Sequence, residues 1–199
     1  MMHPDTSVKW INASKGIGVI ATSFIPKGTI TWVQDELDIL FHPEKAEKLN
    51  PYTAELFEKF SFRNNKGEYI LCWDIAKYVN HSFRSNCLST GYNFEVAIRD
   101  IQVGEELTDD YGYLNLTEAF VPEDEGTERK IVKPDDITVY YADWDAILEP
   151  IFPEILKQKQ ALLTLLPKDV LQEIHQVSAG QKKMLSTKNL YYDPSLIGF

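Results

Sequence analysis

The sequence predicts a mainly β fold followed by an α-helical C-terminal part. Short β-prone runs bounded by glycine, proline or asparagine recur as far as Tyr113, a pattern typical of small strands joined by turns. From Pro134 onward, aromatic and aliphatic residues instead recur three or four positions apart, which is the spacing of helices. The 199 residues are enough for one sizeable core with a small appended unit.

The N-terminal part is predicted to consist of short strands joined by tight turns. In the turn Ile25-Pro26-Lys27-Gly28, proline presets φ and glycine permits the chain reversal. Strands are expected at 8–13, 19–22, 30–33 and 37–41.

The middle of the chain mixes helical and strand patterns. Residues 43–60 are polar and helix-like, and Asn50-Pro51 divides them into two helices. In the second of these, Tyr52, Leu56 and Phe60 recur every fourth residue. A turn is expected at 64–67, strands at 68–73 and 92–99, and a short helical turn at 74–79.

The C-terminal part is predicted to be a helical cap on the β core. A helix begins at Pro134-Asp135-Asp136 and carries aromatic residues that we interpret as core packing. Pro150 and Pro153 interrupt the pattern, and two more helices are expected at 154–166 and 167–177. The pattern does not place residues 178–199.

The charge of the chain favours basic partners. The formal net charge is −10, which argues against direct nucleic-acid binding and favours attraction of a basic protein or peptide. From Asp100 to Glu128 there are ten acids and no Lys or Arg. Two interpretations stay open: a solvated surface, or an acidic rim that collects a Lys/Arg-rich peptide beside Tyr111.

No membrane-spanning run and no secretory signal are visible in the sequence. We therefore expect a cytoplasmic or nuclear protein without membrane contact, although a secreted effector stays open. The two cysteines fit a reducing compartment.

Several familiar catalytic arrangements are missing from the sequence. His81 and Ser82 are neighbours and make a poor nucleophile–base pair. Cys72 and Cys87 form no C-x-x-C pair, so a zinc site is not expected. No Gly-rich phosphate loop is present. The remaining Tyr, Asn, His and Gly residues suit a group-transfer site that positions two partners.

Most of the chemically informative residues lie in one segment, 78–115. Taken singly, each motif could be turn punctuation or ordinary packing. The segment contains Asn80-His81-Ser82, Asn86-Cys87, Gly104-Glu105-Glu106-Leu107-Thr108 and Asp110-Tyr111-Gly112-Tyr113, in that order. This combination resembles the catalytic core of the SET-domain family, protein-lysine methyltransferases that use S-adenosylmethionine.

The resemblance implies a SET-domain fold of the β-clip type, built from small sheets. The Asp110-Tyr111-Gly112 segment would pass beneath the loop around Asn80-His81 in a pseudoknot-like arrangement. The implied organisation is a SET domain at 6–116 with a variable insert at about 42–66, an acidic linker at 117–133 and a helical extension at 134–199. The family's zinc-binding post-SET cysteines are absent, so no metal is expected and the closure of the lysine channel is left open.

The resemblance also implies roles for individual residues. Tyr111 matches the catalytic tyrosine, which also lies near the cofactor. The implied cofactor-binding residues are Gly16, Ile17, Gly18, Asn80, His81 and Phe120, the last covering the adenine. Tyr113 and Ser89 are placed in the lysine channel. Ser89 stands where the family often has Tyr or Phe, and its small size favours di- or trimethylation.

The expected function is thus S-adenosylmethionine-dependent methylation of a lysine in a basic protein, a histone or another target. The alternative is a non-catalytic SET module that binds the cofactor or a protein partner. The target, the number of methyl groups added and the oligomeric state do not follow from the sequence.

Overall fold

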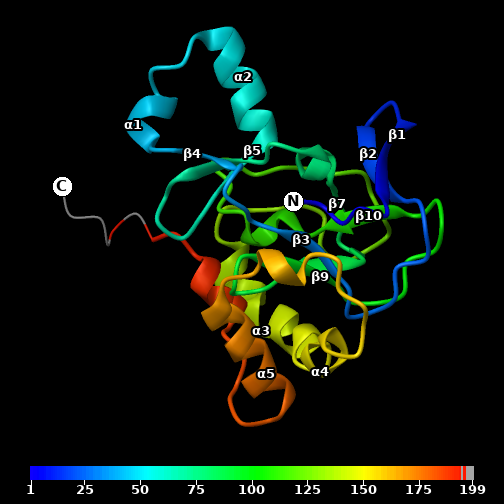
Figure 1. Ribbon diagram of the computed structural model, residues 1–199. Coiled ribbons are helices and arrows are strands. Elements are labelled where there is room, and N and C mark those ends of the chain that lie inside the picture. The colour runs from blue at the N-terminus through cyan, green and yellow to red at the C-terminus, as the bar shows by residue number, and fades with distance from the viewer. Residues whose placement is uncertain (194, 196–199) are drawn as a thin grey trace.

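Three small sheets form the centre of the computed structural model, which describes residues 1–193 and 195 (Figure 1). The first sheet has the order β1 (Thr6–Asn12), β2 (Gly16–Ala21), β10 (Glu106–Asp109) and β7 (Asn80–His81). The second has the order β3 (Ile30–Val33), β9 (Phe94–Ala97) and β8 (Cys87–Ser89). The third has the order β4 (Ile39–Phe41), β6 (Tyr69–Leu71) and β5 (Ser61–Arg63). The predicted fold of small sheets is confirmed.

The pairing of β7 with β10 brings the two chemical motifs together. These strands run parallel, with Asn80 opposite Thr108 and His81 opposite Asp109. Parallel neighbours require a crossover connection, and here the crossover contains β8 and β9 of the second sheet. The segment after β10 therefore emerges beside Asn80-His81, in agreement with the expected arrangement.

The second sheet lies between the first sheet and the C-terminal helices. Along β9, Phe94 and Val96 pack into the cluster that contains the helices, whereas Ala97 packs against residues of the first sheet. All four residues of β3 and of β9 are buried. A strand covered on both faces has little reason to carry a charge, so Glu95 in the middle of β9 requires an explanation.

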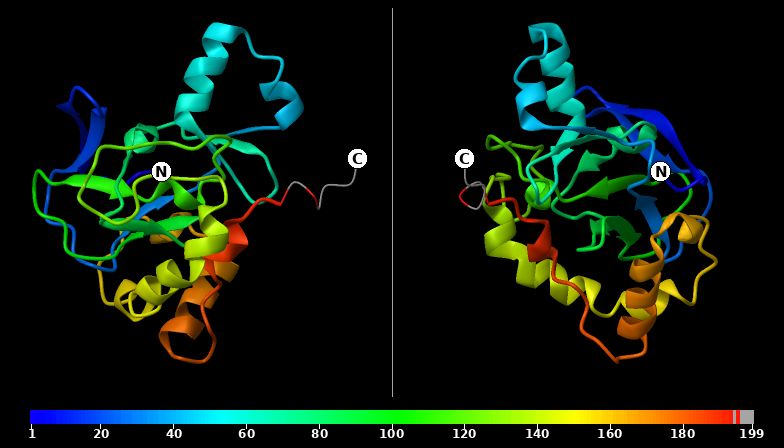
Figure 2. Two further views of the ribbon diagram at one scale, coloured as in Figure 1. Left: turned by 180° about the vertical axis from the view of Figure 1, so that it is seen from behind. Right: turned by 60° about the vertical axis from the view of Figure 1, so that its left-hand side comes forward.

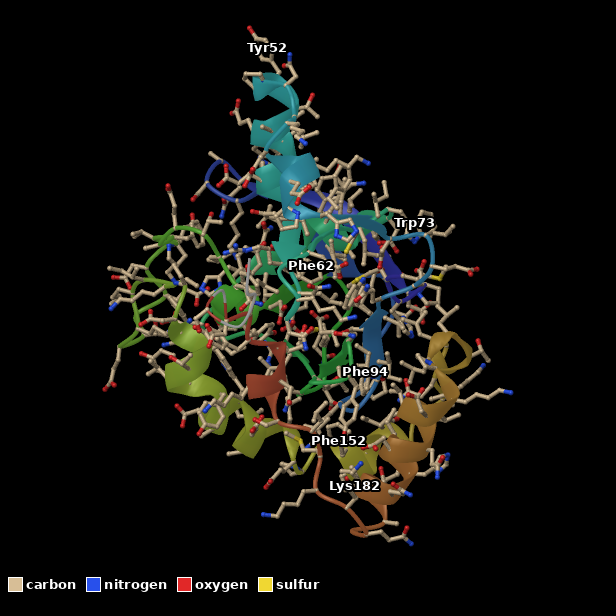
Figure 3. The ribbon with its side chains drawn as sticks, turned by 90° about the vertical axis from the view of Figure 1, so that its left-hand side faces the viewer. Tyr52, Phe62, Trp73, Phe94, Phe152 and Lys182 are labelled. Atoms are coloured by element: carbon tan, nitrogen blue, oxygen red, sulfur yellow. The ribbon has the colours of Figure 1, made fainter. Side chains whose placement is uncertain are left out.

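The insert forms an arm that projects from the body (Figure 1). As predicted, Asn50-Pro51 separates α1 (Pro43–Ala46) from α2 (Pro51–Phe60), and the Asn50 side chain caps α2 by accepting from the Tyr52 N–H at 3.1 Å. Tyr52 is 85% exposed at the far end (Figure 3). Strand β5, which follows α2 directly, was not predicted.

The C-terminal helices gather at the opposite end from the arm (Figure 2). They are α3 (Asp136–Leu148), α4 (Phe152–Ile155) and α5 (Lys168–Ser178), with a 3-10 helix, η3 (Leu163–Leu165), between the last two. The helical cap on the β core is confirmed by the contact of Phe152 with Phe94, whose ring centroids are 6.3 Å apart (Figure 3).

The single helix predicted at 154–166 is wrong, because α4 ends at Ile155. The chain leaves the helix so that the Gln160 amide can pair with the backbone near Gly28. Its Nε2 donates to the Gly28 carbonyl at 2.8 Å, and its Oε1 accepts from the Ile30 N–H at 2.9 Å. These bonds satisfy buried backbone groups that a continued helix would leave unpaired.

The tail returns to the body as the 3-10 helix η4 (Thr187–Leu190). Thr187 is fully buried and donates its N–H and hydroxyl to Asp145 of α3, at 2.8 and 2.9 Å. The Asn115 amide donates to the Leu190 carbonyl at 2.8 Å, which ties the tail to the end of the SET core. Residues 194 and 196–199 of the predicted extension lie outside the described residues.

Candidate active site

A large cavity of about 1020 Å³ opens between the first sheet, the arm and the acidic segment 117–125. All of the sequence-predicted site residues line it except Gly18 and Tyr113. Its size suits a nucleoside-sized ligand together with an extended side chain. The structure therefore brings most of the predicted residues, from four separate parts of the chain, around one space.

Tyr111 is held in the cavity wall by two hydrogen bonds. Its N–H donates to Nδ1 of His81 at 3.1 Å, and its hydroxyl donates to the Val79 carbonyl at 2.6 Å. Burial raises the pKa of Tyr111 above its ordinary value, and the nearby carboxyl groups of Asp109 and Glu106 raise it further. The phenol therefore stays protonated near neutral pH, so it can orient and polarise a ligand but cannot act as a base.

His81 is a neutral, buried imidazole with a spare donor. Because Nδ1 accepts from Tyr111, the neutral ring carries its proton on Nε2, and Nε2 has no partner within the described part of the chain. Burial lowers the pKa of His81 to about 4, and nearby Arg129 lowers it further. The ring centroids of Phe83, Tyr111 and Phe120 lie 4.5, 5.4 and 5.9 Å away. A ligand at this aromatic corner would find an N–H without a competing partner.

Asn80 holds the start of β2 against β7. Its amide donates to the Ile17 carbonyl at 3.1 Å and to Oε1 of Glu106 at 2.8 Å. Gly18 is needed for this approach, because a Cβ there would lie 2.5 Å from the Glu106 carboxylate and 2.8 Å from the Asn80 amide. Gly16, which adopts a positive φ of 74°, opens the strand. The predicted glycine loop, Gly16 to Gly18, thus forms the first three residues of strand β2. The sequence pattern had placed it before the strand.

Residues 117–125, the first part of the acidic linker 117–133, form one wall of the cavity. Phe120 and Val132 exchange backbone hydrogen bonds of 2.9 and 2.8 Å, which closes the segment into a loop. Glu125 accepts from the Ser82 hydroxyl at 3.0 Å and from the Phe83 N–H at 2.9 Å. Phe120, 40% exposed, is thereby held beside Tyr111 at a centroid distance of 6.2 Å. This segment covers the cavity without any cysteine.

Arg129 anchors the same segment to the body. Its guanidinium pairs with Asp110, at 2.5 Å, and with Asp136 at the start of α3. It also lies 4.7 Å from the ring centroids of Phe83 and Tyr140. Sequence reasoning missed this residue, since nothing local marks an arginine that will be covered by distant rings and carboxylates.

The ten acids from Asp100 to Glu128 do not form one surface. Asp109 and Asp110 are buried, 6% and 5% exposed, and Glu106 pairs with Lys15 at 3.1 Å. Only part of the expected rim therefore faces the cavity mouth: Glu118, Glu123 and Glu125 line it.

Tyr113 and Ser89 meet at the inner end of the site. Tyr113 is 1% exposed, packs edge-on against Trp144 and accepts from the Ser89 N–H at 2.9 Å. Its hydroxyl donates to Oδ1 of Asp109. Ser89 lines the large cavity, whereas Tyr113 lies behind it and holds Ser89 and Asp109 in place.

Two buried acids at this inner end were not predicted as site residues. Glu95 and Asp109 both line the cavity, and the Thr31 hydroxyl donates to Oε1 of Glu95 at 2.6 Å. Burial raises the pKa of Glu95 to about 7 and raises that of Asp109 well above its ordinary value. The signal available in the sequence was an acid between apolar residues in the strand Phe94-Glu95-Val96-Ala97.

A metal site requires several ligating side chains close together. Within residues 1–193 and 195, no three or more His, Cys, Asp or Glu side chains are grouped so that they could hold a metal ion. Both Cys72 and Cys87 are buried free thiols, and burial raises the pKa of each.

In the same described residues, no helix is both long and apolar enough to cross a bilayer.

The fold and the site define a domain of small sheets in which two distant motifs meet around one cavity. In the comparison with protein families, residues 16–112 match the SET domain. The chain is therefore a SET-domain protein, a family of the lysine-methyltransferase type whose members generally use S-adenosylmethionine. A search of curated proteins gave no significant match.

Proposed function

We propose that this protein is an S-adenosylmethionine-dependent protein-lysine N-methyltransferase that acts on a basic protein. The observation that carries the proposal is the position of Tyr111, whose hydroxyl is fixed by the Val79 carbonyl at the wall of the cavity lined by Gly16, Asn80 and His81. A protonated, immobile hydroxyl is suited to orienting a transferring methyl group.

The residues around the aromatic corner fit the cofactor. The Phe120 and Tyr111 rings offer π-faces to an adenine or to a sulfonium cation. His81 offers a buried N–H that has no partner among the described residues, and Gly16 and Ile17 line the same cavity. These residues would hold S-adenosylmethionine, which when bound supplies a methyl group activated by positively charged sulfur.

The chain itself has three tasks in such a reaction. The target amine must become neutral although its ordinary pKa is about 10.4, and burial in the cavity favours the neutral form. The reacting atoms must be aligned, which is the task of Tyr111. Water must be excluded, and the wall at 117–125, held by Arg129, serves this purpose.

A basic substrate fits the charge of the cavity mouth. Glu118 and Glu123 are exposed there, and the protein as a whole carries a net charge of −10. A Lys/Arg-rich segment would be attracted to this mouth in a salt-dependent manner. Histones are one class of such proteins, and other basic cellular proteins are equally suited.

The test is methyl transfer from radiolabelled S-adenosylmethionine to core histones and, separately, to a whole-cell lysate. Tyr111→Phe removes only the hydroxyl, and Tyr52→Phe at the tip of the arm is the matched control. Label on a protein band that is lost in Tyr111→Phe and kept in Tyr52→Phe supports the enzyme. No label on any protein, with cofactor binding still seen by calorimetry, would favour a non-catalytic binding module.

A further inference from the structure

Glu95 and Asp109 form a buried carboxyl pair at the inner end of the cavity. They come from neighbouring parts of the fold, β9 and β10, and are 4% and 6% exposed. Both line the cavity, although neither takes part in the cofactor corner around His81. Charged side chains buried to this extent are costly unless something compensates for them.

The contacts of the pair leave it with one uncompensated negative charge. The two carboxyl groups lie close enough to interact, and because two buried carboxylates in contact cannot both be charged, the pair keeps one proton and carries one negative charge. Thr31 donates to Glu95, and Tyr113 donates to Asp109. Neither acid is in an ion pair with a residue of the described part of the chain.

The other groups around the pair supply no positive charge. The titratable groups that face it are the thiols of Cys72 and Cys87, the phenols of Tyr111 and Tyr113, and the carboxyl of Asp110. Arg129, which reaches Asp110 next to the pair, is already bound between Asp110 and Asp136. Burial makes ionisation of the pair difficult, so it is ready to accept a proton near neutral pH.

A second polar group in the same wall also lacks a partner. Trp32, 8% exposed, lines the cavity beside the pair's strand, and its Nε1–H is buried without an acceptor within residues 1–193 and 195. The carboxylate indicates a cationic ligand at this end, whereas the indole N–H requires an acceptor such as a carbonyl group beside that ligand.

We infer that Glu95, with Asp109, accepts the proton of the target ammonium group at the inner end of the cavity. The inference rests on the proposed function and adds a catalytic residue to it. One N–H bond of the ammonium breaks, an O–H bond forms on Glu95, and the nitrogen keeps the electron pair. That pair forms the bond to the methyl carbon of the sulfonium donor, the C–S bond breaks, and its electrons stay on sulfur. The proton on Glu95 returns to water when the methylated product leaves.

The inference predicts how methyl transfer depends on pH. With the pair present, the productive complex contains ionised Glu95 and a charged amine. Both states are populated between about pH 8 and the pKa of the free amine, about 10.4, so kcat/KM should be constant over this range. Without the pair, only the rare neutral amine reacts. In Glu95→Gln/Asp109→Asn, kcat/KM should therefore rise about tenfold per pH unit from about pH 7 to about pH 9.

A matched control separates this effect from burial of a carboxyl in general. Asp38 is also buried, at 5% exposed, with a pKa raised by burial, and it does not line the cavity. Asp38→Asn should keep the plateau of the wild type. A plateau in the double variant, or a wild-type rate that climbs steadily with pH, would overturn the inference.

A binding measurement tests the pair without methyl transfer. Calorimetry with n-butylamine, which carries the four-carbon chain and amine of lysine, should give binding to the wild type at least about tenfold tighter than to Glu95→Gln/Asp109→Asn. Equal affinity, or no binding to the wild type, refutes the inference alone. Wild-type protein that binds n-butylamine through the pair but methylates no protein refutes the proposed function alone.

Discussion

Replacement of Arg129 by methionine should destabilise the protein and open the cavity. The side chains of Arg129, Asp110 and Asp136 are 14%, 6% and 5% exposed, so removing Arg129 leaves two buried carboxylates that keep hydrogen bonds but lose their cation. Methionine keeps apolar contact with the rings of Phe83 and Tyr140. The loss is therefore mainly electrostatic.

The size of the effect follows from the burial of the network. Breaking a buried ion pair by removing one partner costs about 3–5 kcal/mol. Because Arg129 keeps some contact with water, we expect the lower end, about 3 kcal/mol, in urea unfolding. For a chain of this size, that corresponds to a fall in Tm of about 6–12 °C. Cofactor affinity should fall as well, since Arg129 anchors the wall that holds Phe120.

The neighbouring cation provides the control. Lys130 pairs with Asp124 at the surface, where the side chains are 49% and 70% exposed. Lys130→Met should therefore leave the urea unfolding curve nearly unchanged. Adding Asp136→Asn to Arg129→Met should recover part of the loss, because one stranded charge is removed. If Arg129→Met unfolds within about 1 kcal/mol of the wild type, Arg129 does not act as this anchor.

Three further outcomes are expected at the site. Gly18→Ala should weaken cofactor binding at least about tenfold by calorimetry, because the added Cβ displaces Glu106 and the Asn80 amide. Unchanged affinity would show that cofactor binding does not need the close contact of β2 with these two side chains. The pKa of His81 is lowered to about 4, so the unfolded chain binds its proton first, and wild-type stability should fall as the pH drops from about 6.5 to 4. In His81→Gln, the free energy of unfolding measured with urea should fall by up to about 3 kcal/mol less than in the wild type over this pH range. If the free energies of the two proteins change with pH in parallel, the assignment is contradicted. Glu95 has a raised pKa in the folded protein, so stability is lost as the pH rises from about 4.5 to 7. Over that range the free energy of unfolding of Glu95→Gln should rise relative to that of the wild type. A constant difference between the two proteins would argue against an ionising Glu95.

The sequence alone determined those features that depend on neighbouring residues. The division of the insert at Asn50-Pro51 and the turn at Gly28, which adopts a φ of 87°, follow from backbone restrictions of single residues. The core segment was also recognisable, since its motifs are continuous in the chain. The closeness of Asn80-His81 to Tyr111 was expected only through the resemblance, because a parallel pairing across a long crossover has no local signature.

The tertiary structure decided which polar residues are buried and what they face. In the sequence, Glu95 is one acid in a short strand, and Asp109 is one more member of an acidic run. Only the packing of the neighbouring strands shows that both are buried. The end of α4 likewise depends on Gln160 reaching backbone groups some 130 positions earlier in the chain. Arg129 becomes an anchor only when Asp110 and Asp136 converge on it. Desolvation and charge pairing are properties of the packed surroundings, so no local pattern carries them.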